Sequence, residues 1–219
     1  MNRVDLTLYA IVDAENLGAE NLAAFAGDAA RNGATVVQYR DKYSGTRLLV
    51  ERARAIHAAL AGSGVPLLVN DRVDVALAAG AEGVHIGRED MTADDARRLL
   101  GPDAIIGLTV KNEADARAAI KAPIDYACIG GVFQTLSKDN PDAPVGLEGF
   151  QRLAMLIRAE RPDMPIGAIA GMTLRTAPMT IAAGADGIAA IGALFKSGKV
   201  PEAVRAMRLA IERALEERT

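Results

Sequence analysis

The sequence has few of the residues that mark several common classes of protein. It contains one cysteine, Cys128, and no tryptophan, and only 4% of its 219 residues are aromatic. A single cysteine excludes an internal disulfide and a cysteine-rich zinc site, and it fits a reducing compartment such as the cytoplasm. The scarcity of aromatic side chains argues against a platform on which nucleic-acid bases stack.

Long apolar runs and an excess of positive charge are also missing. No run approaches the roughly 18 consecutive apolar residues of a membrane-spanning helix, and the start, MNRVDLTLYAIVD, lacks the pattern of a signal peptide. The net charge of −3 argues against a broad basic patch for nucleic acid. Half of the residues are hydrophobic, which is enough for a sizeable core, so we expect one domain over residues 1–219. The sequence leaves open whether the chain forms a homo-oligomer.

Short β-rich runs alternate with longer runs of helical period along the whole chain. The expected strands are Leu6–Asp13, 35–41, 67–71, 83–87, 104–110, 125–130, 165–171 and 187–195. The expected helices are Asn21–Asn32, Thr46–Ala61, a short helix ending at Gly80, one opening at Thr92, Glu113–Lys121, Leu147–Glu160, Leu174–Ala183 and Pro201–Glu217.

This alternation predicts an α/β protein built as a (β/α)₈ TIM barrel. The expected strands are continuously apolar, as strands covered on both faces are, and eight strand–helix units match the number in such a barrel. A doubly wound open sheet is the alternative. It usually carries a G-x-G-x-x-G turn after its first strand, where this chain has DAENLGAEN.

Polar side chains follow the second expected strand. The two-residue period of a strand places Gln38, Arg40 and Lys42 on the same face as Val36, with Tyr39 on the other. If Val36 points into the barrel, two cations and an amide line its mouth, where barrels hold their active sites. Such a set suits a phosphate or diphosphate, although both cations could instead pair with acids at the rim.

Two carboxylates follow the next two strands. Asp71 comes directly after the third strand and Asp90 lies in the loop after the fourth. Oxygen ligands with room for water and a substrate phosphate suit Mg²⁺. Each acid has an ordinary alternative role, as a helix cap or a solvated loop residue, and their position beside the cationic side chains favours the metal site.

Several other residues are weaker candidates for a functional role. His85 lies between apolar neighbours on the fourth strand, and we interpret it as structural; Cys128 lies in an apolar strand and is interpreted as core. The long segment 131–146 carries Thr135, Ser137 and Lys138, which could close over an anion. Turns with glycine end the last two strands, at Gly171 and Gly192, where many barrels bind phosphate.

These motifs, taken together, resemble one enzyme family over nearly the whole chain. The order and spacing of QYRDK, ND at 70–71, GVHIGREDM, GLTV at 107–110, FQTLSK and IAGM are similar to those of thiamine phosphate synthases. The resemblance implies a (β/α)₈ barrel that joins hydroxymethylpyrimidine diphosphate to a thiazole phosphate. The products would be thiamine phosphate and pyrophosphate.

The resemblance also implies a role for individual residues. The pyrimidine diphosphate would be bound by Gln38, Arg40, Lys42, Asn70 and Lys138, with Thr109 on the pyrophosphate and Asp71 and Asp90 as ligands of Mg²⁺. The thiazole phosphate would be bound by Thr135, Ser137, Gly171, Ile191 and Gly192. Arg40, Lys138 and Thr109 would stabilise the leaving group and so carry the catalysis.

The chain departs from the family pattern at four positions. Thr109 and Ser137 exchange one hydroxyl residue for another, Ala170 replaces the first glycine of IGGI, and Gly192 replaces a serine. The last two changes touch the thiazole side, and they support one alternative, a paralogue that binds ligand without turnover. Two further alternatives stay open: a thiazole tautomerase that needs no pyrimidine diphosphate, and a sugar-phosphate isomerase or epimerase.

Overall fold

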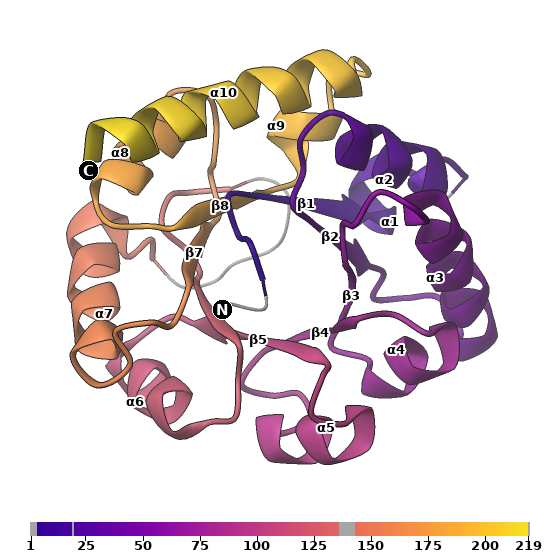
Figure 1. Cartoon of the computed structure of the whole chain (residues 1–219), viewed down its shortest axis with the longest axis horizontal. Coiled ribbons are helices and arrows are strands. Elements are labelled where there is room, and N and C mark those ends of the chain that lie inside the picture. The colour runs from indigo at the N-terminus through magenta and orange to yellow at the C-terminus, as the bar shows by residue number, and fades with distance from the viewer. Residues whose placement is uncertain (1–3, 19, 136–142, 219) are drawn as a thin grey trace.

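In a computed structural model that describes residues 4–18, 20–135 and 143–218, the strands form a closed parallel barrel surrounded by helices (Figure 1). The strands follow one another in chain order from β1 to β8, and β8 closes the barrel by pairing with β1. The predicted (β/α)₈ barrel is therefore confirmed, and the doubly wound sheet is wrong.

The elements lie close to their expected positions. The strands are β1 Leu8–Asp13, β2 Val36–Arg40, β3 Leu67–Asn70, β4 Gly83–Ile86, β5 Ile105–Val110, β6 Tyr126–Ile129, β7 Ile166–Ile169 and β8 Gly187–Ala190. The helices are α1 Ala14–Leu17, α2 Leu22–Arg31, α3 Thr46–Leu60, α4 Val73–Ala79, α5 Ala93–Leu100, α6 Glu113–Lys121, α7 Gly146–Glu160, α8 Thr176–Ala182, α9 Gly192–Phe195 and α10 Val200–Arg218.

The structure differs from the expected elements in two places. Residues 187–195 are not one strand, because β8 ends at Ala190 and the following GALF forms the short helix α9. An apolar run of this length fits a strand or a buried helix equally well, so periodicity alone could not divide it. The short helix α1 was not expected; it begins where Asp13 accepts hydrogen bonds from the backbone of Glu15 and Asn16.

The buried side chains of the strands divide between two separate packing layers. Tyr9, Val36 and Leu68 belong to an apolar cluster inside the barrel, whereas Leu8 and Val37 pack in the larger cluster between the strands and the helices. This alternation confirms that Val36 points into the barrel. Side chains of the same parity that follow it on β2 therefore point to the barrel mouth.

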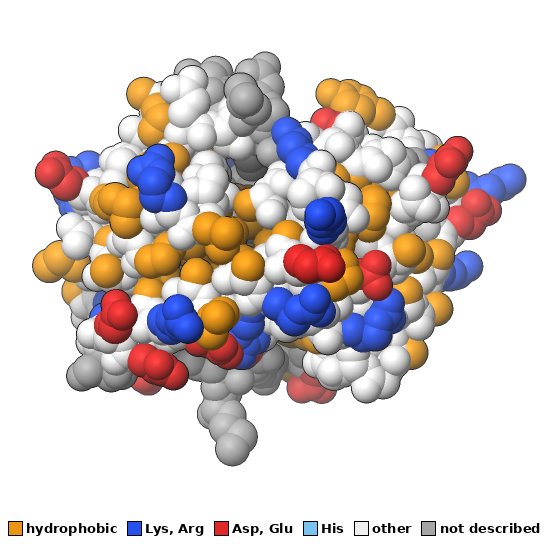
Figure 2. Space-filling view, turned by 90° about the horizontal axis from the view of Figure 1, so that it is seen from above, with side chains coloured by type: hydrophobic (Ala, Val, Ile, Leu, Met, Phe, Trp, Pro, Cys, Tyr) orange, Lys and Arg blue, Asp and Glu red, His pale blue; other side chains and the backbone are white. Residues whose placement is uncertain are grey.

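The outer surface carries mixed side chains. Figure 2 views the molecule from the α10 side, where hydrophobic side chains lie among charged ones. Met179 of α8 and Leu209 of α10 are exposed, and isolated apolar side chains of this kind are common on protein surfaces. Within the described ranges, none of the helices is long and apolar enough to cross a membrane.

Candidate active site

A cavity of about 340 Å³ lies at the carboxyl ends of the strands. Most of the residues expected to bind the diphosphate line it together, although they come from β2, β3, β4, β5 and the turns that follow them. The predicted residues in its lining are Gln38, Arg40, Lys42, Asn70, Asp71, Asp90 and Thr109. The structure thus brings these side chains together, while the role of each stays a prediction.

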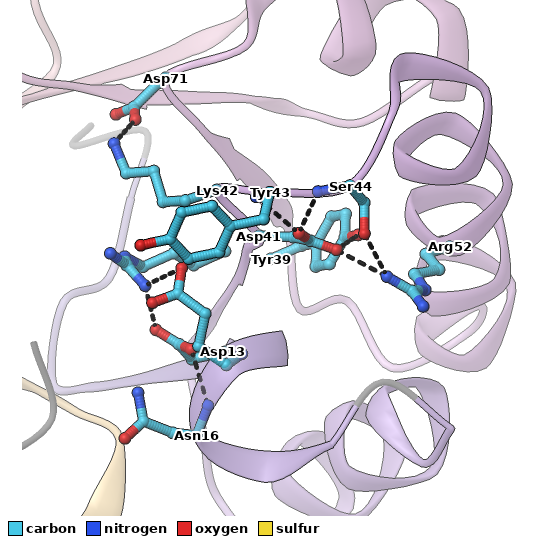
Figure 3. A network of polar contacts seen from close by, with 11 residues as sticks. Asp13, Asn16, Tyr39, Asp41, Lys42, Tyr43, Ser44, Arg52 and Asp71 are labelled. Carbon is cyan, nitrogen blue, oxygen red and sulfur yellow. Dashed lines mark hydrogen bonds and ion pairs between the residues drawn. The ribbon is translucent and has the colours of Figure 1, made fainter.

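The end of β2 has two chemically different faces (Figure 3). Gln38, Arg40 and Lys42 line the cavity. On the opposite face, the Tyr39 hydroxyl donates to Asp41 at 2.9 Å, and Arg52 of α3 donates to the same carboxylate at 2.7 Å. The outer contacts fasten the turn after β2 to α3, so that the inner side chains project from a fixed backbone.

Both cations at the end of β2, Arg40 on the strand and Lys42 just after it, also pair with acids. Arg40 Nη1 lies 2.6 Å from Asp13 and 3.2 Å from Glu15, and Lys42 pairs with Asp71. Burial opposes the charge on Arg40, but Asp13 and Glu15 outweigh it and raise its pKa. The pairing that we considered as an alternative to ligand binding is therefore present, at side chains that line the cavity.

Asp71 and Asp90 face the same end of the cavity. Asp71 has a positive φ of 62°, and its backbone N–H donates to the carbonyl oxygen of His85 at 2.8 Å. It does not cap α4, whose N-cap is Arg72. Burial, together with the neighbouring Asp90 carboxyl, raises the pKa of Asp71 above its ordinary value. Two carboxylates that oppose each other's charge are a suitable donor pair for a divalent cation.

The pair of carboxylates, Asp71 and Asp90, fits Mg²⁺ better than it fits a metal ion whose ligands all come from protein side chains. Among the residues that the structure describes, no cluster of three or more His, Cys, Asp or Glu side chains could hold a metal ion. Mg²⁺ commonly takes one or two carboxylates and completes its shell with water and substrate phosphates. Asp71 and Asp90 meet that requirement at a cavity that Arg40 and Lys42 also line.

A second cavity, of about 220 Å³, adjoins the first at the ends of β7 and β8. The two share Ile169, Ala189 and Ile191 in their linings. The residues expected on the thiazole side that line it are Thr135, Gly171, Ile191 and Gly192. Ser137 and Lys138 lie outside the described residues.

The turn after β7 is constrained at two neighbouring residues. Ala170 has a φ of 88°, which L side chains rarely adopt, and Gly171 has a φ of 68°. A Cβ atom on Gly171 would lie 2.5 Å from the Cβ of Phe133 and 2.7 Å from the carbonyl oxygen of Gln134. The glycine therefore lets the turn after β7 approach the segment after β6.

Sequence reasoning missed two tyrosines that lie with His85 at the bottom of the first cavity. Tyr9, His85 and Tyr126 are buried inside the barrel and joined by hydrogen bonds, and Tyr9 and His85 line the cavity. His85, which we interpreted as structural, is hydrogen-bonded to Thr109. The inward parity of Tyr9 with Ile11 was the signal available in the sequence. Cys128 is buried as expected but also lines the cavity.

The comparisons with known proteins agree over the whole barrel. A family model described as thiamine monophosphate synthase matches residues 8–194. The thiamine-phosphate synthase of Agrobacterium fabrum is 57% identical over 218 residues, covering 100% of this chain and 99% of the relative. That of Azorhizobium caulinodans is 39% identical, covering 95% of this chain and 96% of the relative.

Solved structures give the same result. A thiamine phosphate pyrophosphorylase from Pyrococcus furiosus superposes with a TM-score of 0.85 and 34% identity, covering 97% of this chain and 98% of that one. A structure titled native KDPGal has a TM-score of 0.69 and 18% identity, and it shows the fold alone. The sequence and structural matches together show that this chain belongs to the thiamine monophosphate synthase family.

Proposed function

We propose that the two adjoining cavities join hydroxymethylpyrimidine diphosphate to a thiazole phosphate, with Mg²⁺ on the diphosphate. Formation of thiamine phosphate is the activity of the family to which the chain belongs. The observation that carries the proposal is the convergence of cations, an amide, a hydroxyl and two carboxylates in one cavity, directly beside a second cavity. Two anionic substrates that react with each other require such neighbouring sites.

The first cavity is the proposed site of the pyrimidine diphosphate. Asp13 and Glu15 hold Arg40 through Nη1, and the further N–H donors of a guanidinium suit phosphate oxygens. Lys42, Asn70 and Thr109 would bind the same group, and Gln38 would bind the ring. Asp71 and Asp90 would hold Mg²⁺, which supplies positive charge to the diphosphate oxygens when it is bound.

The reaction that we propose begins with loss of pyrophosphate. The bond between the CH₂ group of the pyrimidine and a diphosphate oxygen breaks, and the electron-rich aminopyrimidine delocalises the positive charge left on carbon. Arg40, Thr109 and Lys138 would stabilise the negative charge on the leaving group. The thiazole nitrogen, positioned from the second cavity by Thr135, Ser137, Gly171, Ile191 and Gly192, then attacks that carbon. No strong general base is required.

Substituents on the pyrimidine test the order of these steps. Electron-withdrawing groups on the ring destabilise a cationic carbon, so the single-turnover rate should fall steeply as they become stronger. A rate that is insensitive to the substituent would instead require the thiazole to attack before pyrophosphate leaves.

The activity itself is tested with purified protein, Mg²⁺ and both substrates by following thiamine phosphate. We expect turnover that needs Mg²⁺ and collapses in Asp71→Ala and in Lys138→Ala. Asp74→Ala is the matched control, because Asp74 pairs with Arg72 and is not among the residues that line the cavity. Binding of pyrimidine diphosphate without turnover would indicate the non-catalytic paralogue. Isomerisation of thiazole phosphate alone would indicate the tautomerase.

We also place the enzyme in the cytoplasm. Its single cysteine, Cys128, is buried and forms no disulfide, as suits a reducing compartment. Fractionation of cells that express the chain tests this, and recovery in the periplasmic or extracellular fraction would contradict it.

A further inference from the structure

Five polar side chains form a continuous hydrogen-bonded chain across the interior of the barrel. Gln38 Nε2 donates to the Tyr9 hydroxyl at 2.5 Å, and the Tyr9 and Tyr126 hydroxyls lie 2.9 Å apart. The Tyr126 hydroxyl is 2.8 Å from His85 Nδ1, and His85 Nε2 is 2.9 Å from Thr109 Oγ1. The chain connects β2, β1, β6, β4 and β5, and it links two residues that we expect to touch substrate.

The packing around this chain holds its members in place. Gln38 and Tyr9 are 2% exposed, Tyr126 is fully buried and His85 is 8% exposed. The rings of His85 and Tyr126 are stacked at 5.6 Å between centroids. A Cβ atom on Gly107 would lie 2.0 Å from the Tyr126 ring, so the glycine provides the space that this ring occupies. Rotamers fixed in this way keep the donors and acceptors aligned.

The positions of the protons along this series of hydrogen bonds can be assigned starting from Gln38, its first donor. Gln38 Nε2 has no lone pair to offer, so the Tyr9 oxygen accepts there. Burial raises the pKa of Tyr9, and burial together with Tyr9 raises that of Tyr126, so both phenols keep their single proton at neutral pH. The direction that gives each phenol one accepting and one donating contact has Tyr9 donating to Tyr126 and Tyr126 donating to Nδ1 of His85.

The direction of the hydrogen bond between His85 and Thr109 follows from the directions assigned to the bonds that begin at Gln38. An imidazole that accepts at Nδ1 and is neutral carries its proton on Nε2, and here Nε2 faces Thr109 Oγ1. Thr109 accepts that proton, so its own hydroxyl proton is directed to the cavity. In the reverse arrangement Thr109 would donate to His85 and present only lone pairs to an anion, which is unfavourable.

We propose that Gln38, Tyr9, Tyr126 and His85 form a one-directional hydrogen-bond relay that makes the Thr109 hydroxyl a donor to a phosphate oxygen in the cavity. Tyr9, Tyr126 and His85 are therefore positioning residues, and they act on substrate through Thr109. The choice of a phosphate oxygen as acceptor rests on the proposed function, whereas the direction of the relay does not.

The tautomer of His85 tests the direction of the relay without any ligand. His85 and His57 are the only two histidines, so the imidazole nitrogens of a ¹⁵N-histidine-labelled protein give two signal sets, assigned with His57→Gln. We expect His85 to carry its proton on Nε2 and to have an unprotonated Nδ1. Protonation of Nδ1, alone or together with Nε2, would overturn the proposal.

Two phenylalanine variants provide a matched comparison. Tyr126→Phe keeps the buried ring but removes the donor to His85, so we expect the Nδ1 and Nε2 signals of His85 to move toward an averaged pair of tautomers. Tyr39→Phe also removes a hydroxyl hydrogen bond from a buried ring, but on the outer side of β2. It should leave the His85 signals unchanged. Unchanged His85 signals in Tyr126→Phe would contradict the relay.

Binding of inorganic pyrophosphate in the presence of Mg²⁺ tests the purpose of the relay. We expect Thr109→Val and Tyr126→Phe each to weaken binding about tenfold, which corresponds to losing one hydrogen bond to a charged group. Thr109→Ser, which restores the hydroxyl, should bind as the original protein does. Equal binding by Thr109→Val and Thr109→Ser would overturn the donor role. If the unaltered protein bound no pyrophosphate, the proposed function would fail, and the His85 tautomer would still decide the direction of the relay.

Discussion

At the scale of single residues, Ala170 is held in a backbone conformation that glycine adopts more readily. Its φ of 88° costs an L residue on the order of 1–2 kcal/mol, and its carbonyl oxygen accepts a hydrogen bond from Phe133 that fixes the turn. Ala170→Gly relieves the strain but adds roughly 0.4–1 kcal/mol of unfolded-state entropy. We therefore expect a net gain of about 0.5–1 kcal/mol in the free energy of unfolding, measured by urea denaturation.

The neighbouring residue, Gly171, allows the opposite substitution, from glycine to alanine. Gly171→Ala adds a Cβ atom at a φ of 68° and places it 2.5 Å from Phe133. It should destabilise the protein and weaken binding of thiazole phosphate, because Gly171 lines the second cavity. A lower stability of Ala170→Gly than of the unaltered chain would show that the turn relaxes around alanine without strain.

At the scale of elements, the corner between β2 and α3 depends on one buried carboxylate. Asp41 accepts hydrogen bonds from the backbone of Tyr43 and Ser44 as well as from Tyr39 and Arg52 (Figure 3). Burial opposes ionisation of Asp41, but these contacts outweigh it and lower its pKa below the ordinary 3.8. The charged form is thus favoured by folding, and Lys42 follows directly on this anchored corner.

We expect Asp41→Asn to lower the free energy of unfolding by about 2 kcal/mol at neutral pH, because hydrogen bonds to a charged group are lost. A lowered pKa contributes stability above 3.8 that disappears as the pH falls through the folded-state pKa. The difference between variant and original chain should therefore shrink at strongly acidic pH. Asp28→Asn, which breaks an exposed pair on α2, should cost less than about 1 kcal/mol. Equal costs for the two variants would contradict the buried anchor.

The elements also explain which parts of the site could be predicted from the sequence. The period of β2 correctly places Gln38, Arg40 and Lys42 on the cavity side, because alternation in a strand is a local property. The acids that hold Arg40 could not be predicted, since Asp13 meets Arg40 only through the pairing of β1 with β2. His85 and Tyr126 are 41 residues apart, and their hydrogen bond depends on barrel closure rather than on local pattern.

At the scale of the whole molecule, closing the barrel brings like charges together at its mouth. Asp71 and Asp90 follow different strands, and burial of Asp71 near Asp90 makes its ionised form less favourable in the folded than in the unfolded chain. A cation bound between them, as proposed above for Mg²⁺, would offset this cost. Part of the binding free energy of that cation would then go into removing the repulsion between the two carboxylates.

Thermal stability, measured with and without Mg²⁺, should show both the repulsion between Asp71 and Asp90 and its loss when the metal binds. At neutral pH without metal, we expect Asp71→Asn to melt at a higher temperature than the original chain, because it removes a buried charge. A raised folded-state pKa means that the penalty is present above that pKa and disappears as the pH falls through it, so the advantage of the variant should shrink on acidification. Mg²⁺ at about 100 times its Kd should stabilise the original chain by roughly 2.7 kcal/mol and leave Asp71→Asn unchanged.

Asp74→Asn, in the first turn of the neighbouring helix α4, serves as the control. Its partner Arg72 lowers the pKa of Asp74, so neutralising it should slightly destabilise the metal-free protein, the opposite sign to Asp71→Asn. It should keep the full response to Mg²⁺, because Asp74 is not among the residues that line the cavity. Differential scanning calorimetry of the three proteins with and without Mg²⁺ measures both effects. An equal Mg²⁺ response in Asp71→Asn and Asp74→Asn would place the metal away from Asp71, and the arrangement of charges proposed for this cavity would have to be abandoned.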